Sequence, residues 1–96
     1  MDKIEAREIL ERKMQELRTC PYSQLLIWIR ERKVEVHEVK GKSGAEYQIE
    51  LEVVWDGQPE GNIMVIGSID DGRWPAGFFP LTESFILSPG GSFVGE

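Results

Sequence analysis

The chain has 96 residues, of which 41% are hydrophobic and 29% are charged, and its formal net charge is −6. This length supports one domain with a single modest core, and the composition is typical of a globular protein and excludes extensive disorder. Because an acidic protein repels a phosphate backbone, the net charge disfavours nucleic-acid binding.

The cysteine content and the lengths of the apolar segments indicate the cellular compartment of the protein. Cys20 is the only cysteine, so the chain forms no internal disulfide and suits a reducing compartment. The longest apolar segment, 25–29, is far too short to span a membrane. The first residues are charged and include no signal-peptide stretch. The sequence therefore predicts a cytoplasmic protein without membrane contact.

The first third of the chain predicts two helices. In the first, over 2–18, apolar residues recur at helical spacing and form one stripe: Ala6, Leu10, Met14 and Leu17. Asp2 and Glu5 resemble a capping box at its start. Pro21 suits the first position of a second helix over 21–32. The break between them indicates either helices folded against each other or helices tilted along a sheet.

At residue 33 the period changes from 3.6 to 2, which indicates a change from helix to strand. The range 33–40 alternates. It places Val34 and Val36 on one face and Glu35 and His37 on the other. This pattern predicts a strand with one apolar and one polar face.

The next strand is predicted over 45–56, after a glycine-rich turn at 41–44. Its apolar face is formed by alternate residues: Tyr47, Ile49, Leu51, Val53 and Trp55. Pairing Lys40 with Ala45 would place the apolar faces of both strands on the same side of the sheet, so the pattern favours this register.

A third strand is predicted over 62–69, and its centre is apolar on both faces. Such strands are usually covered on both sides, yet the two helices are the only obvious covers. The second face would therefore meet the C-terminal segment, a second subunit or a partner. The residues assigned to this candidate interface are Val54, Ile63, Met64, Val65 and Ile66.

The remaining segments predict short strands and turns. A fourth strand over 76–80 contains or adjoins prolines, which favours an edge or a bend. A turn is expected at 81–84. A terminal hairpin would join 85–88 to 92–95 through the turn at 89–91.

Together these elements predict a single α+β domain over 1–96. Residues 2–32 would form its helices, and residues 33–95 would form its antiparallel sheet. The architecture is an N-terminal helix pair packed on a bent meander of four to six strands. It resembles a cystatin-like or nuclear-transport-factor-like cone, which implies no function by itself. The Gln-x-Val-x-Gly turn of inhibitory cystatins is absent.

The sequence predicts that a functional site lies in the loop 67–80. Asp70 and Asp71 precede a glycine, and this pattern favours a tight turn over a metal site, because calcium loops need several spaced oxygen ligands. Arg73 and Trp74 are residue types common at interfaces. They would either close the end of the core or contact a binding partner.

Catalytic chemistry finds little support in the sequence. His37 has no nucleophile placed near it by spacing, and Cys20 fits a small buried apolar position. One histidine and one cysteine cannot form a structural zinc site in a monomer. The sequence therefore predicts no catalytic residue, metal or cofactor, and favours a non-enzymatic protein.

Several segments resemble a family of small bacterial proteins of uncharacterised function. They are residues 67–74, 79–86 and 92–96, together with Pro21-Tyr22 and Tyr47-Gln48-Ile49-Glu50. The resemblance covers most of the chain. It implies a bacterial origin and brings no activity, ligand or catalytic residue.

Two functions follow from these observations. The first is a non-enzymatic protein-interaction or self-associating module, either a homodimer or a binder of a protein partner, because the third strand lacks a second cover. The alternative is a small-molecule binder or minor enzyme with a pocket at the loop 67–80. There Trp74 would contact an apolar group, Arg73 an anionic group, and Asp70 or Asp71 a polar group.

Overall fold

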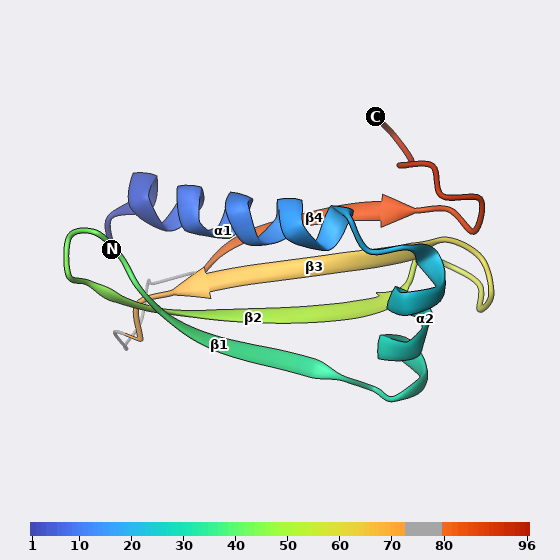
Figure 1. Cartoon of the computed structure of the whole chain (residues 1–96), viewed down its shortest axis with the longest axis horizontal. Coiled ribbons are helices and arrows are strands. Elements are labelled where there is room, and N and C mark those ends of the chain that lie inside the picture. Colours follow the sequence, from blue (N-terminus) through green and yellow to red (C-terminus); the bar gives the residue numbers. More distant parts are fainter. Residues whose placement is uncertain (73–79) are drawn as a thin grey trace.

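The computed structural model describes residues 1–72 and 80–96. Within these ranges, two helices precede four strands: α1 (Lys3–Arg18), α2 (Tyr22–Arg30), β1 (Val34–Lys40), β2 (Glu46–Trp55), β3 (Ile63–Asp70) and β4 (Leu81–Leu87). The strands form one antiparallel sheet in the order β1-β2-β3-β4 (Figure 1). The predicted α+β class, with a helix pair on an antiparallel meander, is confirmed.

Helix α1 forms as its sequence pattern predicts. Asp2 caps it, because its Oδ1 accepts hydrogen bonds from the backbone N–H groups of Ile4 and Glu5 at 3.1 and 3.0 Å. The four residues of the predicted apolar stripe are all buried. The side chain of Glu5 does not complete a capping box, because it bonds to the β1–β2 turn instead.

Helix α2 is shorter than predicted. It follows Pro21 and ends at Arg30, because Arg32 adopts a left-handed conformation with φ 52°. The N–H of Lys33 then donates to the carbonyl of Trp28 at 2.9 Å, a bond typical of a Schellman C-cap.

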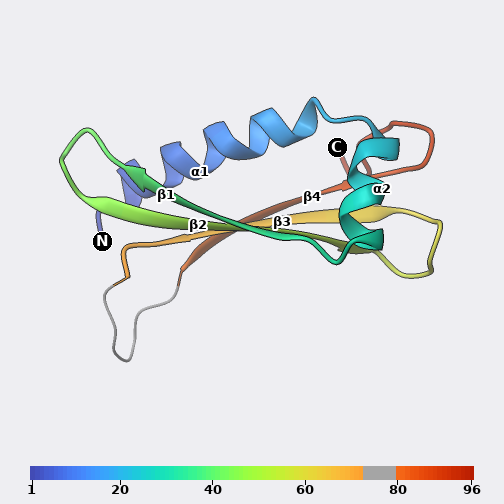
Figure 2. The same cartoon turned by 60° about the horizontal axis from the view of Figure 1, so that its bottom comes forward.

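Both helices lie on one side of the sheet, α1 along β3 and β4 and α2 across the end of β2 (Figures 1 and 2). They bury one apolar core with the inward-facing strand residues, including Leu51, Ile63 and Val65 at 0% exposure. Gly67 lies where α1 approaches β3, and its missing side chain leaves room for Met14. No helix in the described ranges is long and apolar enough to cross a membrane.

The register of β1 differs from the prediction by one residue. Lys40 pairs with Glu46, so the turn contains five residues instead of four. Because side chains alternate along a strand, this shift reverses the predicted faces. Glu35 and His37 point to the helix side, whereas Val34 and Val36 point away from it and are 47% and 52% exposed.

The C-terminal part also differs from the prediction. Residues 81–84 begin strand β4 instead of forming a turn, and they pair with β3 from Leu81 opposite Ile69. The turn at 89–91 is present, and Phe93 forms an isolated bridge with Leu87. The strand predicted over 76–80 falls almost entirely outside the described residues.

Candidate functional site

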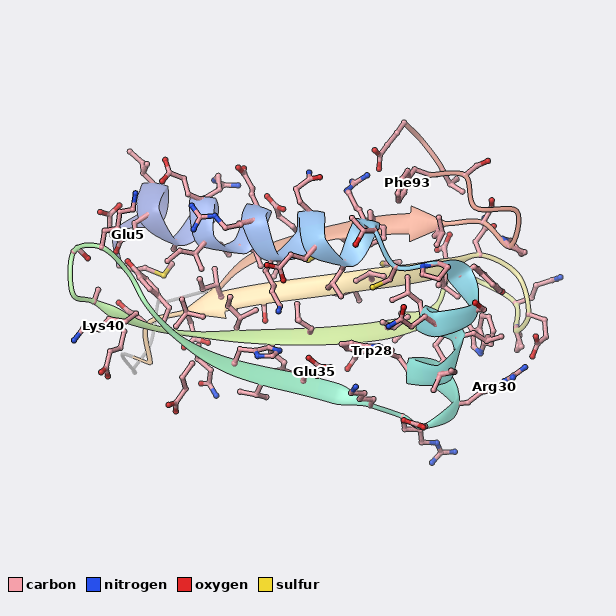
Figure 3. The ribbon with its side chains drawn as sticks, in the orientation of Figure 1. Glu5, Trp28, Arg30, Glu35, Lys40 and Phe93 are labelled. Atoms are coloured by element: carbon pink, nitrogen blue, oxygen red, sulfur yellow. The ribbon has the colours of Figure 1, made fainter. Side chains whose placement is uncertain are left out.

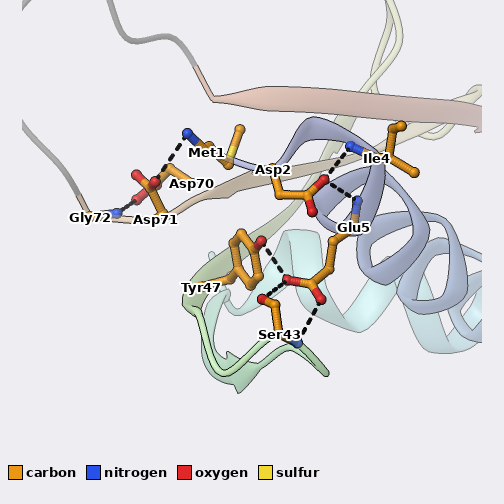
Figure 4. Close-up of polar contacts among 9 residues, drawn as sticks. All are labelled: Met1, Asp2, Ile4, Glu5, Ser43, Tyr47, Asp70, Asp71 and Gly72. Atoms are coloured by element: carbon orange, nitrogen blue, oxygen red, sulfur yellow. Dashed lines mark hydrogen bonds and ion pairs between the residues drawn. The ribbon is translucent and has the colours of Figure 1, made fainter.

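The acidic pair of the predicted functional loop is partly used to form a turn. Asp70 Oδ1 accepts a hydrogen bond from the N–H of Gly72 at 2.8 Å, and Gly72 has a φ of 71° (Figure 4). This is an Asx-turn, in which the aspartate side chain replaces a backbone acceptor. Asp71 Oδ2 lies 3.6 Å from the α-amino nitrogen of Met1. The two adjacent carboxylates therefore have different partners.

Arg73 and Trp74, the other two candidates in that loop, lie outside the described residues. The described part of the loop lines a hollow of about 320 Å³, to which Asp71 and Gly72 contribute beside Tyr47 of β2. A second hollow of about 420 Å³ runs between α1 and the β1–β2 hairpin, with Ile9 on one side and Val39 and Ile49 on the other. Both volumes fall within the range of small-molecule sites.

The five candidate interface residues divide between the two faces of the sheet. Ile63 and Val65 are fully buried beneath the helices, so they belong to the core of the folded chain. Val54, Met64 and Ile66 point to the opposite face and are half-buried. Sequence periodicity alone could not decide which alternate set the helices would cover.

We call the side of the sheet opposite the helices the open face, because the described residues place no helix or strand over it (Figure 2). It comprises Val34, Val36, Glu38 and Lys40 of β1, Glu46, Gln48, Glu50, Glu52 and Val54 of β2, Met64, Ile66, Ser68 and Asp70 of β3, and Thr82, Ser84 and Ile86 of β4. Six of these side chains are apolar, which is unusual for a sheet face exposed to water.

Most apolar and most acidic side chains of the open face occupy different ends. The exceptions are Glu52, which lies between Val34 and Ile66, and Val36, which lies opposite Glu50. Val54, Met64 and Ile86 form one row across three strands, with Ile66 beside them. The acidic end lies toward the β1–β2 turn and contains Glu38, Glu46, Glu50 and Asp70. Among the described residues of this face, Lys40 is the only cation. No carboxylate of the open face forms an ion pair within the described part of the chain.

The N-terminus of α1 is joined to the β1–β2 turn by a polar cluster. The Glu5 carboxylate accepts hydrogen bonds from the N–H and hydroxyl of Ser43 at 3.0 and 2.6 Å and from the Tyr47 hydroxyl at 2.7 Å (Figure 4). The bonds from Ser43 and Tyr47 lower the pKa of Glu5. Burial and the bond to Glu5 raise the pKa of Tyr47 to about 12. These opposite shifts are typical of a structural hydrogen bond between a phenol and a carboxylate.

A second polar cluster lies near α2. Glu35 accepts a hydrogen bond from His37 at 2.7 Å and pairs with Lys33 at 3.0 Å, and the Lys33 ammonium lies 4.8 Å from the Trp28 ring centroid. Figure 3 labels Glu35 on β1 and Trp28 on α2. Burial alone would raise the pKa of Glu35, but the bonds from Lys33 and His37 outweigh it and lower this pKa. Within the described ranges, no group of three or more His, Cys, Asp or Glu residues could hold a metal ion. Cys20 is a half-buried free thiol at the end of α1.

Comparison of the chain with protein-family models, with curated proteins and with solved structures finds no match.

Sequence reasoning missed Val34 and Val36 as surface residues because it placed them in the core. The glycine-rich turn was the sequence signal that could have found them. Gly44 adopts a φ of 90°, which a glycine tolerates easily, and the connection between the paired residues Lys40 and Glu46 has five residues instead of four. The structure therefore adds two exposed valines to the candidate surface.

Proposed function

We propose that the protein is a non-enzymatic protein-interaction module of the cytoplasm and that the open face is its binding surface. The observation that carries this proposal is the composition of that face, where six apolar side chains lie on the side away from both helices. Burying such side chains is worth about 25 cal/mol per Å² of apolar area. Contact with a second copy of the chain or with another protein would supply this burial.

Site-specific photo-crosslinking in cells that produce the protein tests this proposal. A photoreactive residue at Ser84 or Val36 on the open face should give discrete cross-linked products. The matched controls are Ile4 and Ile27, which are 76% and 50% exposed on the helices. Products that form equally from the helix positions, or no product from either open-face position, would contradict the proposal.

A small-molecule site is the second candidate, favoured by the 420 Å³ hollow beside α1. Its walls combine apolar side chains with four cations and four carboxylates, so an anionic group of a ligand would bind beside the cations, of which Arg12 is one. A thermal-shift screen of metabolite carboxylates and phosphates tests this candidate. A hit should be lost in Arg12→Gln, and a screen without any stabilising compound would count against the site.

A further inference from the structure

We infer that the occupant of the open face is one basic amphipathic helix of another protein. This inference rests on the proposed function and specifies the chemistry of the partner. Three features carry it: the charge of the face, the two-fold symmetry that self-association would require, and the dimensions of the four-stranded sheet.

The charge of the open face favours a basic partner. The described residues of the face present five carboxylates and a single ammonium group, and among the described residues none of these carboxylates forms an ion pair. Lysine or arginine side chains on a partner would neutralise these charges and accelerate its association.

The same charges disfavour a second copy of the chain. In a symmetric dimer the open faces would stack about a two-fold axis lying between them. With the axis along the strands, the acidic ends of the two copies would meet. With the axis across the strands, the acidic end would cover the row of Val54, Met64 and Ile86. The first arrangement juxtaposes like charges, and the second removes carboxylates from water without pairing them.

The dimensions of the face fit a single helix. Four strands span about 14 Å, and β2 extends about 26 Å from Glu46 to Val54, so the planar area is about 360 Å². A helix is about 10–12 Å wide and covers 26 Å with about 17 residues. It would occupy the face much as α1 occupies the opposite side.

The separation of apolar and acidic ends specifies the pattern of this helix. Its contact stripe should carry apolar residues over the half that meets Val54, Met64 and Ile86. It should carry lysine or arginine over the half that meets Glu38, Glu46 and the other carboxylates near the β1–β2 turn. A helix with these residues evenly mixed along the stripe would place charges on the apolar row.

Three fluorescein-labelled 18-residue peptides test the inference by fluorescence anisotropy with the full chain. The first carries leucine at the contact positions of one half and lysine at those of the other. The second has the same composition with leucine and lysine alternating along the stripe, and the third has glutamate in place of lysine. The first should bind best, the alternating peptide several-fold more weakly, and the acidic one without detectable affinity.

Two double variants with equal changes in net charge assign the binding to the face. E46Q combined with E50Q removes two open-face carboxylates, whereas E8Q combined with E11Q removes two exposed carboxylates of α1. Removing two ion pairs should weaken binding of the first peptide by roughly twofold to thirtyfold. The α1 variant should bind within about twofold of the unmodified chain. Val36→Thr, which keeps a strand-forming side chain, should also weaken binding.

Equal losses in both double variants, or equal binding of the leucine–lysine and alternating peptides, would overturn the inference. Sedimentation velocity separates this failure from failure of the proposed function. Self-association that Val36→Thr abolishes would retain the open face as an interface and overturn the basic helix as its occupant. If neither peptide binding nor self-association responds to open-face substitutions, both proposals fail.

Discussion

Helix α1 approaches β3 closely at Gly67. Adding one methyl group at this position should therefore lower the stability of the folded chain. A Cβ atom built there would lie 2.6 Å from Met14 Sδ and 3.1 Å from Leu10 Cδ1. Both distances are shorter than the contacts that carbon atoms accept at optimal packing. Gly67→Ala should therefore displace the Met14 side chain and strain the contact between helix and sheet.

The magnitude follows from two opposing effects. Overpacking a dense core costs about 1–3 kcal/mol. Replacing a glycine whose conformation alanine can adopt stabilises the folded state by about 0.4–1 kcal/mol, because it lowers the conformational entropy of the unfolded chain. Gly67→Ala should thus lower the free energy of unfolding by roughly 1–2 kcal/mol, which shifts the Tm of a domain this size by roughly 4–15 °C.

Urea unfolding at 25 °C measures this effect in two backgrounds. In a Met14→Ala background the sulfur atom is absent and only the longer contacts to Leu10 and Leu51 remain, so adding Gly67→Ala should cost less than in the unmodified chain, with a coupling of about 1–3 kcal/mol. Gly90→Ala is the matched control, because the nearest atom to its added Cβ is Ser88 Oγ at 3.9 Å. The reasoning is refuted if Gly67→Ala causes the same loss in both backgrounds, since the cost would then not arise from Met14.

Three further predictions concern the cap and the polar cluster of α1. Asp2→Ala should lower the free energy of unfolding by about 1 kcal/mol through loss of the N-cap, and Asp2→Asn, the control, should retain most of it. Because hydrogen bonds lower the pKa of Glu5 below 4.5, its stabilising contribution should be present above pH 4.5 and lost as the pH falls through the folded-state pKa. Urea unfolding should show the stability difference between the unmodified chain and Glu5→Gln shrinking over that range, and a constant difference would contradict it. The pKa of Tyr47 is shifted in the opposite direction, upward. Its contribution to the free energy of unfolding should therefore be present below pH 10 and lost between pH 10 and about 12. Absorbance at 295 nm should show a titration step near pH 12 that is absent in Tyr47→Phe, and a spectrum without that step would contradict this.

The fold class was predictable because local patterns and tertiary packing agree over most of the chain. The α1 stripe of Ala6, Leu10, Met14 and Leu17 has helical spacing, and the helix buries it as a unit. The alternation in β2 likewise predicts its buried face. Residues 81–84 were less predictable, because their strand conformation depends on pairing with β3, and only Leu81 in that segment is apolar.

The candidate site was less predictable because it depends on which face of each strand the helices cover. In β3 both alternate sets are apolar, so the sequence alone does not distinguish core residues such as Ile63 and Val65 from surface residues such as Met64 and Ile66. The cluster of Glu5 with Tyr47 was also missed, because its two residues are 42 positions apart and meet only in the folded chain.

The length of the β1–β2 turn links the errors at the site to its proposed chemistry. A four-residue turn would have turned Val34 and Val36 toward the helices and Glu35 and His37 toward the open face. The five-residue turn reverses this arrangement and adds two valines to the surface. Glu5 bonds to Ser43 within this turn, so the contact that anchors α1 also supports the register that makes the open face apolar.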